Sequence, residues 1–408
     1  MLVLWFFCVV SVAGRSVLAT QQVIDGGGAT GMELVGRLLA AVGEERVEAG
    51  VSIRGVYRPA AEDRVMPPTF PNGPYLQEQR RIDEALRTTV VLDQVPSQVN
   101  RVEEALLSAR DKGRIELPLF ELRAQTSRGP VRLTSLEFPH RYADAYLRDS
   151  TVGGVRFDKS EVGLRLRETR TEDARPLFER DPGSLIYGAW DSHRKGRWPK
   201  FARFYTSSMF GLDPEVGERR AMRADPLNLT GGIDDKAKAE ADWAFVQTGA
   251  KSKGGRLSEI GHGNALSEKA PPGGVFISEA RRDAWISLGG LERVRFGDAS
   301  QEVAQLARAT LLALALAGDR LAFDRPSLWL RSGCDLVRVR EVVAFEGDGG
   351  EVTPVEVNAA QALEAFQQLR ERTAKAGLVM AGDAIVVEPI KSLASAIEFA
   401  VSKAASEE

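Results

Sequence analysis

The 408-residue chain has little of the chemistry that builds disulfides, metal centres or nucleotide-hydrolysing sites. Its cysteines are Cys8 and Cys334, and its histidines are His140, His193 and His262. Two distant cysteines make no disulfide framework, and no cysteine–histidine spacing matches a zinc site. The phosphate-binding pattern GxxxxGK[ST] is also absent from the sequence. We therefore expect no metal, no cofactor and no ATP binding.

An excess of positive charge is missing as well, since the net charge is −3 and the isoelectric point is about 5.9. Any binding to nucleic acid must therefore depend on a local patch. A hydrophobic content of 43% and a charged content of 27% are ordinary for a globular protein with a sizeable core.

The N-terminus carries an apolar run, Leu2–Ala13, without the preceding lysine or arginine of a secretory signal. The run is too short for a comfortable membrane-spanning helix. A glycine-rich spacer follows, and an amphipathic pattern begins at Met32. We expect residues 1–31 to lie outside the fold and residues 32–408 to form one elaborated domain. A true signal peptide is the alternative, and it would make the chain an exported binding protein.

Beyond Met32, helical and strand patterns alternate irregularly, which favours an α+β fold over a Rossmann sheet. The expected strands are 50–57, 87–95, 115–122, 131–136, 185–190, 275–278, 284–288, 327–331, 336–345 and 384–389. The expected helices begin at Met32, Pro96 and Pro139, with others over 301–317, 358–374 and 392–403.

A basic segment follows the apolar run at 185–190. No acidic residue lies between Asp191 and Asp213, and the rings of Trp198, Phe201, Phe204 and Tyr205 are interleaved with the cations. Cations that meet phosphates beside rings that meet bases can hold a single-stranded nucleic acid. An ordinary solvated loop is the alternative interpretation.

A long glycine-rich stretch, about 223–274, lacks periodicity and predicts a mobile or functional insertion. Lys251, Lys253 and Arg256 give it a local positive charge ahead of His262. The glycines on either side of His262 allow the backbone to approach a ligand closely. We expect His262 near a nucleic acid, with a histidine that satisfies a buried turn as the alternative.

Catalytic patterns are weak. His140 and Asp144 share one face of the helix expected after Pro139, but Ser150 lies nearly three turns from His140 and no nucleophile elbow is present. We therefore expect no catalytic site.

Several segments together resemble one protein family. They are VLDQVPSQVNRVEEAL (91–106), SLEFPHRYADAYLRDS (135–150), RFDKSEVG (156–163), LIYGAWDSH (185–193), KFAR (200–203), SEIGHGN (258–264) and LRSGCDLV (330–337). In this order they resemble the backbone subunit of type I CRISPR Cascade complexes, a Cas-seven type protein of the RAMP superfamily. The subtype most similar is I-G, formerly I-U, and the resemblance spans roughly residues 50 to 345.

The resemblance implies a modified ferredoxin-like core of the RNA-recognition-motif kind, with long inserted loops. It implies a cytoplasmic, non-enzymatic subunit that polymerises along CRISPR RNA beside other Cascade subunits, away from any membrane. The guide's bases stay exposed to pair with target DNA. Backbone subunits of related type III complexes cut RNA with an acidic loop residue, so an RNA endonuclease of that kind is the alternative, with Asp149, Asp158 or Asp191 as the candidates. Combined with the patterns above, it gives these RNA-binding candidates: Asn100, Arg101, His140, Arg141, Arg148, Ser192, His193, Arg194, Lys195, Arg197, Lys200, Arg203, Lys251, Lys253, Arg256 and His262.

The first prediction concerns the leader. Deletion of residues 1–31 should leave folding and RNA binding intact, because the amphipathic pattern starts at Met32. Circular dichroism and RNA-binding titrations of the truncated and full chains measure both properties. Loss of the folded protein, or recovery of a processed form from the periplasm, would contradict the prediction.

Overall fold

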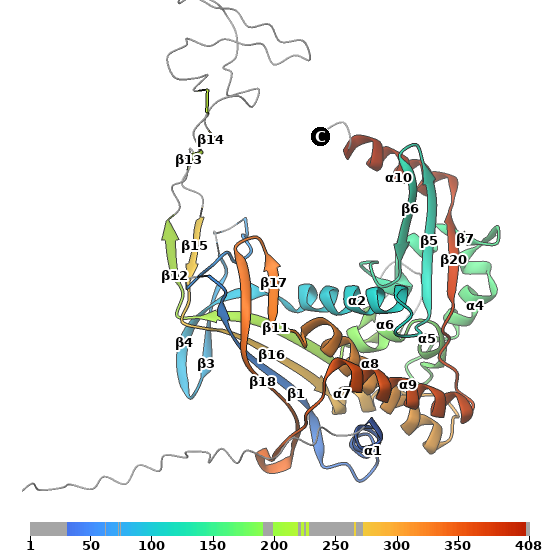
Figure 1. Ribbon diagram of the computed structural model, residues 1–408. Helices are drawn as coiled ribbons and strands as arrows, with labels where there is room; N and C mark the ends of the chain where they lie inside the picture. Colours follow the sequence, from blue (N-terminus) through green and yellow to red (C-terminus); the bar gives the residue numbers. More distant parts are fainter. Residues whose placement is uncertain are drawn as a thin grey trace, which may run out of the picture.

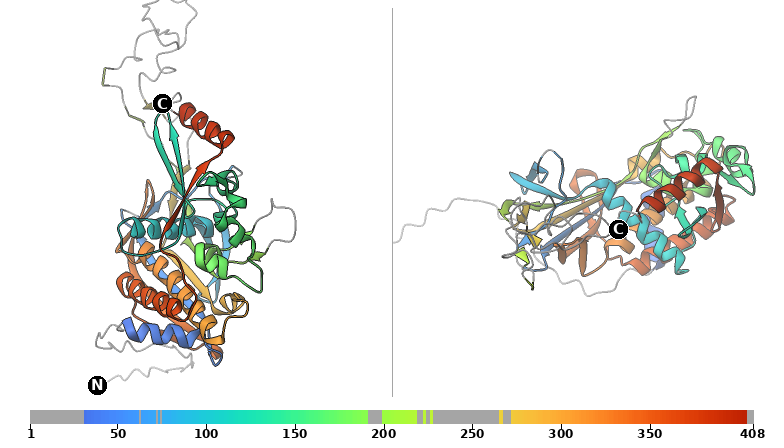
Figure 2. Two further views of the ribbon diagram at one scale, coloured as in Figure 1. Left: turned by 90° about the vertical axis from the view of Figure 1, so that its right-hand side faces the viewer. Right: turned by 90° about the horizontal axis from the view of Figure 1, so that it is seen from above.

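The computed structural model describes residues 31–190 except 62, 72 and 74, and then 199–218, 222–223, 226–227, 265–266 and 272–404. These residues form a body from which two groups of strands project on the same side (Figures 1 and 2). Within this part of the chain, no helix combines the length and the apolar character that crossing a membrane requires.

The body is built on an antiparallel sheet with the strand order β17-β18-β1-β16-β11-β4-β3, and β19 pairs with β18 (Figure 1). The strands are β1 (Glu48–Pro59), β3 (Gln77–Ile82), β4 (Ala85–Asp93), β11 (Tyr205–Leu212), β16 (Ala280–Ser287), β17 (Ser327–Arg331), β18 (Cys334–Gly347) and β19 (Val352–Pro354).

The four central strands and two helices follow the ferredoxin-like order. Along the chain they come as β1, α2 (Val95–Asp111), β11, β16, α8 (Gln301–Phe323) and β18. In the sheet the same strands lie as β18-β1-β16-β11, so the fourth strand is beside the first and the third beside the second. The β3–β4 hairpin is an insertion between β1 and α2. The predicted α+β fold with inserted elements is confirmed.

Helices cover one face of this sheet. The centre of α8 is buried, as its apolar composition predicts, and the helix continues six residues past the predicted end to Phe323. Local signals define where these helices begin, because Ser300 caps the N-terminus of α8, and Asn358 forms a capping box with Gln361 at the start of the helix that follows it. The other helices of this layer are α1 (Gly31–Ala41), α7 (Leu288–Glu292) and α9 (Ala359–Lys375).

A second sheet forms one projection, with the order β6-β5-β20-β7-β8, and β20 lies parallel to β5. Its elements are β5 (Leu119–Thr126), β6 (Gly129–Thr134), β7 (Ser150–Val152), β8 (Val155–Arg156), β20 (Ala384–Pro389) and the following α10 (Lys391–Ala404). The other projection contains β2 (Arg64–Val65), β12 (Glu215–Glu218) and β15 (Pro272–Phe276), followed outward by β13 (Met222–Arg223) and β14 (Ala265–Leu266). Most of the insertion predicted at 223–274 lies outside the described residues.

The strand predicted at 185–190 is wrong over most of its length. Residues Pro182–Tyr187 form the short helix α6, which Asp181 caps and Pro182 begins. The helix ends at Gly188, whose φ of 88° suits glycine. An apolar run of this length has no periodicity that separates a buried strand from a buried helix, so the capping pair Asp181–Pro182 was the better signal.

The helix predicted from Pro139 to Ser150 is also wrong as a continuous element. The chain forms a 3-10 turn over Arg141–Ala143 and then the single turn α3 (Ala145–Arg148), with extended backbone at Asp144 between them. The Asp144 carboxylate accepts from the backbone N–H groups of His140 and Tyr146. An aspartate that caps a turn interrupts a helix, so His140 and Asp144 do not share a helix face.

The remaining short elements lie between β8 and β11, apart from one 3-10 turn that joins β18 to β19. They are α4 (Glu161–Arg167), α5 (Arg175–Arg180), the strand pair β9 (Ala189–Trp190) and β10 (Lys200–Phe201), and the 3-10 turns at Phe157–Lys159 and Asp348–Gly350.

A buried network of charges joins the main sheet to α8. Arg282 of β16 and Arg320 of α8 both pair with the Asp319 carboxylate, and Tyr205 of β11 donates to it over 2.7 Å. Arg320 Nη1 also lies 2.5 Å from the Glu341 carboxylate of β18. Burial alone would raise the pKa of Asp319, but the two guanidinium groups outweigh it and lower that pKa to about 2.

The second prediction follows from this network. Asp319→Asn should lower the free energy of unfolding by about 3–5 kcal/mol at pH 7, because it leaves the two buried arginines Arg282 and Arg320 with Glu341 as their one remaining carboxylate in the network. Since the carboxyl pKa is depressed from 3.8 to about 2, its stabilising effect is present above pH 3.8 and is lost as the pH falls through 2. Urea denaturation measures the change.

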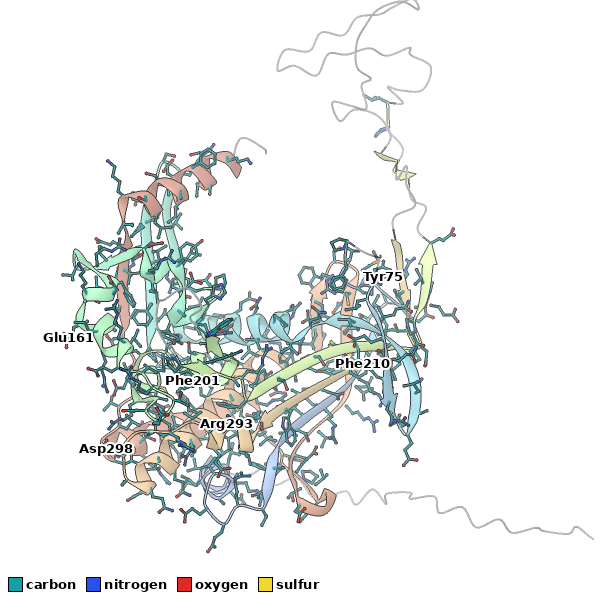
Figure 3. The ribbon with its side chains drawn as sticks, turned by 180° about the vertical axis from the view of Figure 1, so that it is seen from behind. Tyr75, Glu161, Phe201, Phe210, Arg293 and Asp298 are labelled. Carbon is teal, nitrogen blue, oxygen red and sulfur yellow. The ribbon has the colours of Figure 1, made fainter. Side chains whose placement is uncertain are left out.

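Asp298→Asn is the matched control. Asp298 also pairs with an arginine, Arg175, but its side chain is 88% exposed, as its place at the surface in Figure 3 shows. The control should change stability by no more than about 1 kcal/mol. Equal effects of the two substitutions would contradict the prediction.

Candidate nucleic-acid interface

The described candidate residues lie on α2, around α3 and on the β9–β10 pair. The candidates Ser192, His193, Arg194, Lys195, Arg197, Lys251, Lys253, Arg256 and His262 lie outside the described residues, as do Trp198 and Asp191. Their assignments stay predictions. What the structure does show is how the chain enters and leaves the basic segment at 191–198.

Strands β9 and β10 bracket the basic segment. They pair antiparallel, with Trp190 opposite Lys200 and Ala189 opposite Phe201. The Lys200 ammonium lies 5.0 Å from the centroid of the Trp190 ring, and Trp190 is 56% exposed. An exposed ring beside a cation is the arrangement that receives an unpaired base and its phosphate.

Two of the aromatic residues expected to stack on bases are unavailable. Phe204 and Tyr205 are 2% and 0% exposed, and the Tyr205 hydroxyl belongs to the buried Asp319 network. This part of the sequence interpretation is wrong, because both residues belong to the core at the start of β11. Trp190, which lies in the run assumed to be a buried strand, is the exposed ring that the sequence interpretation missed.

A buried ion pair anchors the chain just before β9. Arg141 donates from Nε and Nη2 to the two carboxylate oxygens of Glu103, at 2.7 and 3.0 Å, and from Nη1 to the carbonyl of Gly188 at 3.0 Å. Its guanidinium also lies 5.5 Å from the centroid of the Tyr187 ring. Burial raises the pKa of Glu103 to about 7, while Arg141 pulls that pKa in the opposite direction.

Close packing also fixes Gly188 and the chain that follows the basic segment. A Cβ atom at Gly188 would lie 3.0 Å from the backbone nitrogen of Arg203. The Phe204 nitrogen donates to the Ile186 carbonyl over 3.1 Å. Both ends of the basic segment are therefore held against each other, and against α2 through Glu103.

On α2, Asn100 is exposed, whereas Arg101 is half-buried and paired with the Asp93 carboxylate. Arg101 Nε lies 2.8 Å from the buried Asp93 carboxylate, and its Nη2 donates to the Leu330 carbonyl over 2.9 Å. Asp93 also accepts from Ser97 and Gln98, each at 2.6 Å. This cluster fixes the start of α2 to β17, where Trp329 is a second exposed ring that the sequence interpretation missed.

The other described candidates differ in whether their side chains are exposed or paired with a carboxylate. His140, Lys200 and Arg203 are exposed. Arg148 lies 2.7 Å from the Asp149 carboxylate, and this hydrogen bond lowers the pKa of Asp149. The structure therefore does not gather the described candidates into one cluster, and their contacts with RNA stay predictions.

The carboxylates proposed for an endonuclease are paired with arginines where they are described. Asp149 pairs with Arg148, and Asp158 lies 3.1 Å from Arg167. Within the described ranges, no group of three or more His, Cys, Asp or Glu side chains is placed to hold a metal ion.

One family model matches the part of the chain that contains the interface just described. No curated protein matches the chain. Residues 51–216 match the model of the family described as CRISPR-associated protein GSU0053. The matched stretch runs from β1 to β12 and includes α2, Arg141 and the β9–β10 pair. Residues 51–216 are less than half of the chain, and over this stretch the match indicates a CRISPR-associated protein.

Proposed function

We propose that the chain binds CRISPR guide RNA and polymerises along the spacer as the backbone subunit of a type I Cascade complex, of subtype I-G. The main support is that the family match covers the stretch in which an exposed tryptophan–lysine pair brackets a run of cations. The ferredoxin-like order of the core agrees with RNA binding, although a fold alone does not assign a function.

In this role the chain positions RNA and does no chemistry. Cations of the basic segment bind phosphates, and Trp190 offers a stacking surface to a base. Bases that stay unstacked pair with target DNA. The partners are CRISPR RNA, target DNA through the guide, further copies of the chain and other Cascade subunits, and the place is the cytoplasm.

The third prediction tests the basic segment. Substitution of Arg194, Lys195 and Arg197 together by alanine should weaken RNA binding similarly for all guide sequences. The slope of log affinity against log salt should fall by about 0.7 for each phosphate that the variant no longer binds. Fluorescence anisotropy across a salt series measures the slope, and circular dichroism checks folding.

The matched control removes three exposed cations, Arg293, Arg372 and Lys375, from the helical side of the body. It should leave the slope unchanged. If the variant binds RNA as the original chain does, the basic segment is an ordinary solvated loop and the prediction is wrong.

The fourth prediction separates two roles for Arg141. Because its donors engage Glu103 and Gly188, we expect it to position the basic segment instead of binding a phosphate. Arg141→Ala and Glu103→Gln should then weaken RNA binding to a similar degree, with little further weakening in the double variant and an unchanged salt slope. A slope that falls by about 0.7 in Arg141→Ala alone would instead assign a phosphate contact to Arg141.

A further inference from the structure

A small hollow is lined by residues from the end of α1 and the turn after it, from α7 and the loop after it, and from α8. These elements lie at the end of the body opposite α10 (Figure 1). Its volume is about 340 Å³, and the charged side chains that line it are Glu44, Arg46, Glu292, Arg295 and Arg308. None of these residues belongs to the candidate RNA interface. We call this site the basic hollow.

The charges in the basic hollow are not balanced. Arg46 lies 2.7 Å from the Glu292 carboxylate and donates to the Glu48 carbonyl. Within the described part of the chain, neither Arg295 nor Arg308 forms an ion pair with a carboxylate. Three guanidinium groups therefore line the hollow against two carboxylates, and one of these, that of Glu292, already pairs with Arg46.

Arg308 is the more informative of the two. It is partly buried on the second turn of α8, and its Nε donates to the Val294 carbonyl over 3.2 Å. Burial lowers the pKa of Arg308, and the neighbouring Arg295 adds to this effect, while Glu292 opposes it. A buried arginine is normally paired with an acidic group, so the surroundings of the Arg308 guanidinium favour an anionic ligand.

The rim selects the kind of anion. Glu44 and Glu292 also line the hollow, and their charges repel a dianionic phosphate or a polyanionic RNA strand more than a single carboxylate. A carboxylate matches the planar donors of arginine and can bind two of them at once. A space of this size admits a side chain or two, and not a run of nucleotides.

We propose that the basic hollow is a docking site for an acidic segment of a partner protein, in which Arg295 and Arg308 bind a glutamate or aspartate side chain. The elements that line the hollow lie at the end of the body opposite α10 (Figure 1), and none of its lining residues is an RNA-binding candidate.

The test uses the full chain without RNA and a fluorescent peptide of alternating glutamate and alanine. The chain should bind this peptide but not the same peptide with glutamine in place of glutamate. Arg295→Gln and Arg308→Gln should each weaken binding about tenfold, the effect expected when one charge-assisted hydrogen bond is removed. Circular dichroism confirms that the variants fold.

Arg293→Gln is the matched control, since Arg293 is exposed, lies two positions from Arg295 and does not line the hollow (Figure 3). It should bind the peptide as the original chain does. No binding of the glutamate peptide at millimolar concentration, or equal weakening in all three variants, would overturn the proposal. Displacement of the peptide by inorganic phosphate at a lower concentration than by free glutamate would also overturn it, in favour of a phosphate site.

Discussion

The pairing of Arg282 with Asp319 is the constraint on which the rest of the structure depends. Both side chains are fully buried, so neither charge can be left alone without a large cost. The pair links β16 to α8, and its neighbours extend the link to β11 through Tyr205 and to β18 through Glu341. Hydrophobic contacts are non-directional, whereas this network places two buried arginines against two buried carboxylates and disfavours any arrangement that separates them.

Local sequence signals predicted much of the fold, and two predicted elements were wrong where a local capping residue decides the structure. Asn358 and Ser300 begin helices where their capping chemistry says they should. The apolar run at 185–190 has no periodicity that separates a strand from a helix, and Asp181 caps a helix there. After Pro139, capping by Asp144 interrupts the predicted helix. The charge network stayed invisible, because Arg282 and Asp319 are far apart in sequence and look like any surface pair of residues.

The candidate interface divides in the same way. The sequence predicts the basic segment from its composition, since cations and missing acids are local properties. It does not predict that Phe204 and Tyr205 are buried while Trp190 is exposed, because burial depends on the packing of α6 and β11. Nor does it predict that Arg141 donates to the Gly188 carbonyl while it pairs with Glu103 on α2. Rigid anchors on both sides of the basic segment reduce the conformational entropy that ordering on a ligand would cost.

The place of β20 has a consequence for biosynthesis. This strand lies between β5 and β7 and pairs with β5 in parallel, although Ala384 and its partner Leu119 are separated by more than half of the chain. Chains emerge from the ribosome N-terminus first, on the order of 10 residues per second, so β5 and β7 lack their shared neighbour until β20 has been made, 265 residues after Leu119. The second sheet is therefore completed only after α8, β18 and α9 of the body have been made. A nascent chain cannot present that sheet to any ligand before then.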